Sequence, residues 1–196
     1  MAARHEIRRD DVMALPDYVK IRSEKRKEMA ARKKNRRVDV GPHVTFYFEN
    51  FDTMWLQVHE MLYIERGGEE QIADELEAYN PLVPKGRELV ATFMIEIDDP
   101  VRRKTVLGRL GGVEETAFIM VNGEKIPALP EEDQDRTTSE GKASSVQFVH
   151  FPLNDAQAET AKKPGAQIIV GLGHENYNHM AVLPEHVRAE LAGDLD

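Results

Sequence analysis

The histidines are the residues of this sequence that most suggest chemistry. There are seven of them in a chain that also carries 35 carboxylates, and neutral imidazole is the commonest metal-ligating side chain. His174 and His179 flank a polar, turn-like segment between two apolar stretches, so both imidazoles could converge at the mouth of one loop. His150 from a neighbouring strand, with His59 or Glu60 from a long helix, would complete a site of three or four ligands. We therefore predict a divalent metal site, for Fe, Mn or Zn, built on His150, His174 and His179.

The same histidines also have a purely structural interpretation. His174 and His179 would then hydrogen-bond the backbone of a tight turn, and His150 would be a half-buried residue of a sheet. Nothing in their spacing requires the three side chains to converge. Both interpretations stay open at the level of the sequence.

A second polar group lies where an expected strand runs into an expected helix. Asn50 and Asp52 precede that helix, and Gln57 and Glu60 share one of its faces because they are about one turn apart. A glutamate at such a junction can have a raised pKa and act as an acid or a base. The predicted ligand-binding residues are Glu49, Asn50, Gln57, Glu60 and Tyr177. The alternative is that Asn50 and Asp52 cap the helix and that Glu60 pairs with an arginine.

Composition and motifs exclude several familiar chemistries. The chain has no cysteine, which excludes thiolate catalysis, thiolate-bound iron–sulfur clusters, cysteine-bound zinc and disulfides. The P-loop, GxGxxG, GxSxG and HExxH motifs do not occur, which argues against the common nucleotide-binding and hydrolase sites. No stretch approaches the roughly 18 apolar residues that span a bilayer, and the N-terminus lacks the apolar stretch of a signal peptide. We expect a cytoplasmic protein that does not enter the membrane.

Charge is spread unevenly along the chain. The net charge is −9, yet residues 1–37 hold half of the 26 Lys and Arg residues and carry +7, which leaves −16 on residues 38–196. Residues 20–37 have neither Pro nor Gly, so we expect a basic helix that begins near Pro16-Asp17, with Asp17 as its cap, on the surface of the acidic body. The simplest role of this helix is charge complementarity within the chain. The alternative is a nucleic-acid or anionic-partner binding module, although a basic helix without interleaved aromatics contacts phosphates and reads no bases.

Hydrophobic periodicity predicts a single α+β domain with a mixed or mainly antiparallel sheet and packed helices. A basic N-terminal helical arm at 1–37 would precede an α+β body at 38–196. Asn122-Gly123, between two strand-like runs, is the strongest short-range signal for a β-hairpin. Residues 130–144 are polar, which indicates a flexible loop in which Arg136 is either a lid contact or simply solvated. The expected strands cover 38–50, 88–98, 116–129, 144–153, 166–174 and 179–183, and the expected helices cover 20–37, 53–66, 69–79, 99–110, 154–163 and 184–193.

Several groups of residues along the chain form a recognisable pattern. They are Phe48-Glu49-Asn50 with Asp52-Thr53, Gln57 with Glu60-Met61-Leu62, Ala78-Tyr79-Asn80-Pro81, Glu96, and His174 with Tyr177. Together they resemble a bacterial family known only as domain of unknown function 3501, over nearly the whole chain. Members of that family are often encoded near rubrerythrin-like and iron–sulfur redox proteins, so the resemblance implies a redox or oxidative-stress accessory role. One departure is Phe51, where the family often has a basic residue, and this argues against a charge-based role there.

Three functions therefore compete. The leading one is a small-ligand or metal-binding accessory protein of redox enzymes, which self-associates as a homodimer and works with a redox-protein partner. The second is the nucleic-acid or anionic-partner module, which would use residues 20–37. The third is a structural protein–protein interaction domain whose acidic body docks a partner. The sequence assigns no catalytic residue and leaves open whether the chain is an enzyme.

Overall fold

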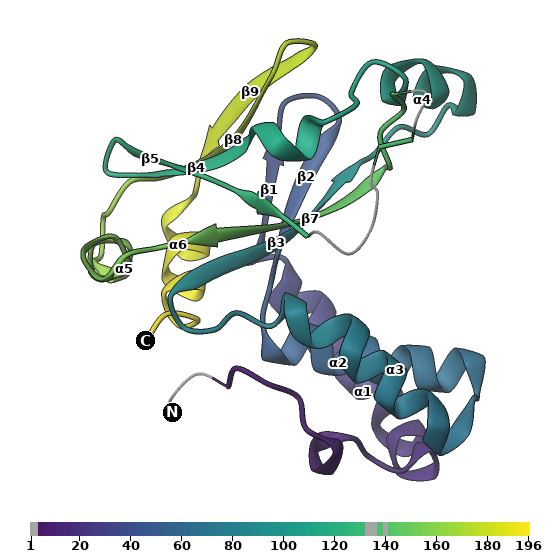
Figure 1. Cartoon of the computed structure of the whole chain (residues 1–196). Helices are drawn as coiled ribbons and strands as arrows, with labels where there is room; N and C mark the ends of the chain where they lie inside the picture. The colour runs from purple at the N-terminus through teal and green to yellow at the C-terminus, as the bar shows by residue number, and fades with distance from the viewer. Residues whose placement is uncertain (1–3, 132–136, 139–140) are drawn as a thin grey trace.

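The computed structural model describes residues 4–131, 137–138 and 141–196. In this part of the chain there are two antiparallel sheets and six α-helices, which confirms the predicted α+β class. The two sheets gather at one end of the molecule, and α1, α2 and α3 lie together at the other (Figure 1). The helices are α1 (Leu15–Lys33), α2 (Phe51–Glu65), α3 (Gly68–Tyr79), α4 (Pro100–Leu107), α5 (Asp155–Lys162) and α6 (Glu185–Ala192).

The larger sheet has five strands in the order β1-β2-β3-β7-β6. They are β1 (Arg37–Val40), β2 (Val44–Glu49), β3 (Glu88–Ile95), β7 (Val146–Pro152) and β6 (Leu129–Pro130). The side-chain alternation of a strand sends Phe46 of β2 and Phe93 of β3 into the core, where their ring centroids are 5.0 Å apart. Gly41 has a φ of 69° and turns the chain between β1 and β2, so the stretch expected as a strand over 38–50 forms two strands.

The smaller sheet has four strands in the order β5-β4-β8-β9. They are β5 (Glu124–Pro127), β4 (Ala117–Val121), β8 (Ile168–His174) and β9 (Tyr177–Val182). Asn122 and Gly123 have φ values of 47° and 91° between β4 and β5, as a tight two-residue hairpin requires. The predicted hairpin is therefore confirmed. The main core takes apolar side chains from the inner faces of both sheets.

Helix α2 begins where the polar junction predicts it. The Asn50 side chain accepts the Thr53 N–H at 3.0 Å, and the Thr53 hydroxyl accepts the Asn50 N–H at 2.9 Å, so two backbone groups at the helix start are satisfied. From this start, Met54 and Val58 enter a second core cluster with Ile72 of α3. None of the described helices is long and apolar enough to cross a membrane.

The basic helix α1 differs from its prediction at both ends. It begins at Leu15 after Ala14, which makes no side-chain cap, so the prediction that Asp17 caps the helix is wrong. Pro16 explains the start, because proline suits the first helical turn. The helix ends at Lys33, before the expected limit, and Arg37 is already the first residue of β1.

Candidate functional site

The predicted metal ligands lie on different sheets. His150 is in β7 of the larger sheet, and His174 and His179 are in β8 and β9 of the smaller one. Among the described residues, no group of three or more His, Cys, Asp or Glu side chains could hold a metal ion. His150, His174 and His179 are therefore not gathered into such a group in the part of the chain that the structure describes, and metal binding by them stays a prediction.

Each of these histidines has other contacts. The His174 ring hydrogen-bonds the Gly111 carbonyl through Nε2 and the Asn176 N–H through Nδ1, each at 3.2 Å. The His179 ring packs edge-on against Tyr177 with centroids 4.6 Å apart. His174 thus has the backbone contacts of the structural interpretation.

His150 lies between two carboxylates. Its Nδ1 is 3.0 Å from Glu88 Oε2, and its Nε2 is 2.7 Å from Glu131 Oε2. Burial lowers the pKa of His150, but hydrogen bonds to Glu88 and Glu131 outweigh burial and raise it above its ordinary value. A charged imidazole donates to both carboxylates, so this cluster joins β3, β7 and the end of β6. Arg136, the lid contact considered in the loop 130–144, lies outside the described residues.

The residues of the predicted ligand site point in different directions. Gln57 donates to the Tyr79 hydroxyl at 3.4 Å, and Asn50 is used in the cap of α2. The Tyr177 hydroxyl accepts the His43 N–H and donates to the Val40 carbonyl at 2.7 Å, so it holds the turn between β1 and β2. None of these three residues lines the cleft between α1 and α2 described below.

Glu49 is the exception in having spare hydrogen-bonding capacity. Its Oε1 accepts from the Thr92 hydroxyl at 2.8 Å, while its Oε2 is buried without a hydrogen-bond partner among the described residues. The side chain is only 5% exposed. A buried carboxylate oxygen without a partner costs free energy, and Glu49 does not line the cleft between α1 and α2 described below.

Glu60 and His59 face α1. Glu60 accepts two hydrogen bonds from Arg22, both at 2.8 Å, and one from the Tyr18 hydroxyl at 2.6 Å. The hydrogen bonds from Arg22 lower the pKa of Glu60, so this carboxylate is the partner of an arginine and not a raised-pKa acid. His59 is buried between the Trp55 carbonyl and the Met13 N–H, and burial lowers its pKa.

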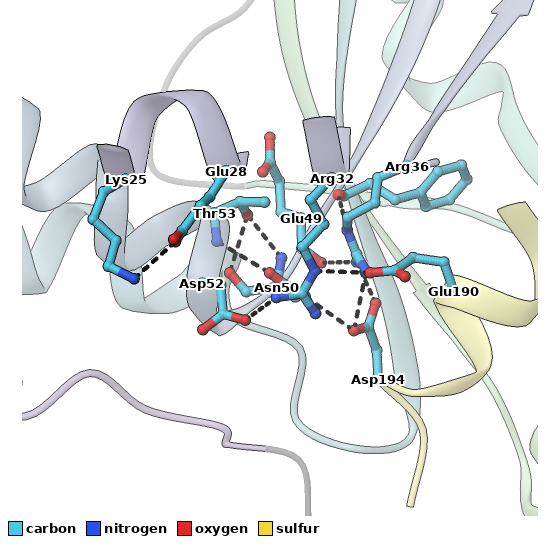
Figure 2. A network of polar contacts seen from close by, with 11 residues as sticks. Lys25, Glu28, Arg32, Arg36, Glu49, Asn50, Asp52, Thr53, Glu190 and Asp194 are labelled. Atoms are coloured by element: carbon cyan, nitrogen blue, oxygen red, sulfur yellow. Dashed lines mark hydrogen bonds and ion pairs between the residues drawn. The ribbon is translucent and has the colours of Figure 1, made fainter. Parts of the chain in front are cut away.

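Basic residues of α1 and the segment after it have a second set of acidic partners, Glu190 in α6 and Asp194 just after it (Figure 2). Arg36 is 1% exposed and ion-pairs with Asp194, while its Nε donates to the Phe48 carbonyl at 3.0 Å. Asn50 also donates to Asp194, at 3.3 Å. Burial raises the pKa of Asp194, although Arg36 opposes this rise. This buried cluster fastens the end of α6 to the junction of β2 and α2.

A cleft between α1 and α2 is the strongest candidate for a binding site. Its volume is about 470 Å³, and we refer to it as the α1–α2 cleft. Met29 and Phe51 form a buried apolar floor, and Trp55 adds a half-buried aromatic wall. The lining residues are Arg4, Lys25, Glu28, Met29, Arg32, Phe51, Asp52, Trp55 and Leu56.

Three cations surround this apolar floor. The Arg4 guanidinium lies 3.6 Å from the Phe51 ring centroid, which is cation–π geometry. Lys25 pairs with Glu28 at 2.8 Å, and Arg32 bridges Asp52 and Glu190. Figure 2 shows Lys25 with Glu28, and Arg32 with Asp52 at the start of α2. Arg4 also ion-pairs with Asp11, so the cleft combines a rim of paired cations with an aromatic interior.

Sequence reasoning missed this cleft. Of its lining, Asp52 was singled out as part of a different group, and Phe51 only as a departure from the family pattern. The basic run was visible, but no spacing rule shows which of its side chains would face Phe51 and Trp55. Arg4 in particular reaches the cleft by a tertiary contact that no local pattern indicates.

Comparison with known proteins confirms the resemblance seen in the sequence. Residues 6–195 match the model of a family described as "Protein of unknown function (DUF3501)". A crystal structure of a novel protein of unknown function from Burkholderia pseudomallei K96243 is similar to this chain, with 39% sequence identity and a TM-score of 0.89. The match covers 97% of this chain and 99% of that one. No curated protein matches the chain.

Proposed function

We propose that this chain, which belongs to the DUF3501 family, binds a small anionic molecule with an apolar body in the α1–α2 cleft. The observation that carries the proposal is the pairing of three cations with an aromatic and apolar floor in one cavity of about 470 Å³. Ligand sites are typically clefts of roughly 300–1,000 Å³ with apolar walls and a few polar groups that fix orientation. The α1–α2 cleft fits this description.

The charges of the rim favour an anion. Arg4, Lys25 and Arg32 line the cleft together with Glu28 and Asp52, while Arg4 also pairs with Asp11 and Arg32 with Glu190, so an anion would bind by replacing one of these carboxylates. A guanidinium binds a carboxylate or phosphate through two parallel hydrogen bonds. Because the side chains of Lys25 and Arg32 are both 42% exposed, their present ion pairs are weak. An incoming anion would therefore displace Glu28 or Asp52 at little cost.

The apolar part of the ligand would lie on Phe51 and Trp55. Trp55 is fixed because its indole N–H donates to the Asp11 carbonyl at 2.8 Å. A preformed aromatic wall reduces the ordering cost of binding. The ligand class is thus an amphipathic anion, such as a carboxylate with an aliphatic or aromatic body.

Trp55 provides a direct test because it is the only tryptophan of the chain. Octanoate should give a saturable change in tryptophan fluorescence, and octanol, which lacks the charge, should bind at least tenfold more weakly. A charged hydrogen bond is worth about 1.5–3 kcal/mol, which is the origin of that factor. Absence of a saturable change with octanoate and with benzoate would contradict the proposal.

The proposal is compatible with two other expectations from the sequence, a redox-protein partner and a cytoplasmic location. A small-ligand protein could work with a redox-protein partner in the cytoplasm, as the sequence suggests. Nucleic-acid binding by residues 20–37 is supported less well, because Arg22, Arg32 and Arg36 pair with carboxylates of the same chain. These pairs support charge complementarity within the molecule. Steep loss of affinity with salt would be the mark of the nucleic-acid alternative.

A further inference from the structure

Two side chains of different chemistry bind the backbone of the segment before α1, residues 4–14, which we call the N-terminal segment. Near its start, the Asn80 amide accepts the Ile7 N–H at 2.7 Å and donates to the Ile7 carbonyl at 2.9 Å. Near its end, the Met13 N–H donates to Nε2 of His59 in α2 at 3.0 Å. An amide does not titrate, whereas an imidazole does. The two attachments therefore respond differently to pH.

The contacts of His59 require a neutral imidazole. Its Nδ1 lies 2.7 Å from the Trp55 carbonyl, which can only accept, so Nδ1 carries the proton and Nε2 accepts the Met13 N–H. A charged imidazole has an N–H on both nitrogens, and the second of these would point at the Met13 N–H. His59 is 1% exposed, so solvent does not reach the ring to replace the lost acceptor. Protonation of His59 therefore breaks this hydrogen bond.

The carboxylates near His59 already have partners, so they are not free to hold an imidazolium. The charged and titratable side chains that line the same cavity are Arg9, Tyr18, Arg66 and Glu69. Glu69 pairs with Arg9 at 2.7 Å, and Tyr18 donates to Glu60, whose oxygens also accept from an arginine of α1. Burial accordingly lowers the pKa of His59. The imidazole is neutral at neutral pH and takes up a proton only in acid.

The N-terminal segment also shapes the α1–α2 cleft. Asp11, two residues before Met13, contacts two of the residues that line it. The Asp11 carboxylate ion-pairs with Arg4, and the Asp11 carbonyl accepts the indole N–H of Trp55 at 2.8 Å. The Trp55 ring in turn packs on His59, with ring centroids 3.9 Å apart. One cation and the aromatic wall of the cleft are therefore positioned by the same short stretch of chain that His59 holds.

We propose that His59 is a proton-operated latch of the α1–α2 cleft. The neutral imidazole holds Met13, and Met13 keeps Asp11 against Arg4 and Trp55. When His59 is protonated, Met13 is released, the contacts of Asp11 loosen, and the cleft binds its anionic ligand less tightly. The effect on the ligand rests on the proposed function of the cleft, whereas the latch itself rests only on the contacts of the N-terminal segment.

Hydrogen exchange measured by NMR tests the latch without any ligand. The protection of the Met13 amide, corrected for the intrinsic exchange rate, should fall by at least about fivefold between pH 8 and pH 5. The Ile7 amide, held by a group that does not titrate, should keep its protection. The Ile95 amide of β3, which donates to the Ser145 carbonyl, should also keep it, and this excludes global unfolding. Protection of Met13 that does not change with pH would overturn the proposal.

A pair of matched variants assigns the effect to one histidine. His59→Gln removes the titrating group of the latch, so the protection of Met13 should no longer depend on pH. His5→Gln makes the same change within the N-terminal segment, at a partly exposed side chain that does not contact Met13, and should keep the pH dependence of the natural chain. If the pH dependence persists in His59→Gln, another group operates the segment and the proposal fails.

Octanesulfonate, an amphipathic anion whose charge is constant over this pH range, tests the link to the cleft by titration calorimetry. It should bind the natural chain and His5→Gln at least about fivefold more weakly at pH 5 than at pH 8, and His59→Gln should show no such weakening. Equal weakening in His59→Gln, or none in the natural chain, would overturn the coupling. Absence of binding at both pH values would contradict the proposed function, and the exchange of Met13 would still decide whether the latch exists.

Discussion

The basic N-terminal segment behaves differently at its buried end and along the α1–α2 cleft. At the buried end, Arg36 is 1% exposed and meets the carboxylate of Asp194, which is also buried. Along the cleft, the side chains of Lys25 and Arg32 are each 42% exposed. They form ion pairs with Glu28 and Asp52 near the surface. The same residue types within one short stretch therefore have different roles. Burial decides whether a cation holds the fold together or remains available to a ligand.

Physical reasoning gives the two regions different energies. Removing one partner of a buried ion pair leaves an uncompensated charge and typically costs about 3–5 kcal/mol. An exposed pair contributes about 0–1 kcal/mol. The predictions below test this contrast, beginning with the largest effect.

Arg36→Met should lower the free energy of unfolding by about 3–5 kcal/mol, because Asp194 would stay buried without its partner. Urea denaturation monitored by circular dichroism measures this. The double variant Arg36→Met/Asp194→Leu should recover part of the loss, since no buried charge is then left alone. A loss below about 1 kcal/mol for the single variant would show that the buried end is no different from the cleft.

Glu60→Gln should have an intermediate effect of about 1–2 kcal/mol at pH 7, because the charged hydrogen bonds from Arg22 and Tyr18 weaken. The pKa of Glu60 is lowered in the folded state, so its contribution is present above the ordinary value of 4.5 and is lost as pH falls through the folded pKa. Urea denaturation of both proteins should therefore show a clear gap at pH 7 that closes toward pH 3. A gap independent of pH would argue against the ion pair.

His150 extends the comparison to a group that titrates near neutral pH. Its pKa is raised in the folded state, so its stabilisation is complete below the unfolded pKa of about 6.5 and is lost as pH rises through the folded pKa. The stability difference between the natural chain and His150→Gln should shrink from pH 5.5 to pH 9. Thermal unfolding across this range measures it, and a difference that grows with pH would contradict the contacts to Glu88 and Glu131.

Lys25→Gln should change the free energy of unfolding by less than about 0.5 kcal/mol, because its pair with Glu28 is exposed. Lys34→Gln is the matched control, with the same charge change at an exposed position just after α1 that does not line the cleft. Chemical denaturation of both variants should give curves that overlay that of the natural chain. A marked loss of stability in Lys25→Gln alone would show that Lys25 holds the fold together, as Arg36 does.

Much of the fold could be predicted because its signals are local. Asn122-Gly123 specifies a turn by its own conformational preference, and Asn50 with Thr53 caps α2 over one helical turn. The α2–α3 boundary at Gly67-Gly68 is local in the same way. β6 was not separated from its neighbours because two residues with a proline carry no strand pattern. Its pairing is set by β7 instead.

The sites could be predicted much less well, because their partners are distant in sequence. Arg36 meets Asp194 across 158 positions, and His150 meets Glu88 across 62. No periodicity connects residues so far apart. The sequence therefore could not show that His150 pairs with carboxylates, and it showed Arg36 only as one member of the basic stretch 20–37. The alternative for Glu60 was that it pairs with an arginine, without saying which one. This agrees with its contact to Arg22.

The most direct test of the account is the dissociation constant of octanoate, measured through Trp55 fluorescence, in Lys25→Gln, Arg4→Gln and the control Lys34→Gln. All three variants lose one positive charge, so a general electrostatic effect would weaken them alike. The account predicts at least fivefold weaker binding for Lys25→Gln and Arg4→Gln and unchanged binding for Lys34→Gln. Equal dissociation constants in the three variants would contradict the assignment of the α1–α2 cleft as the binding site.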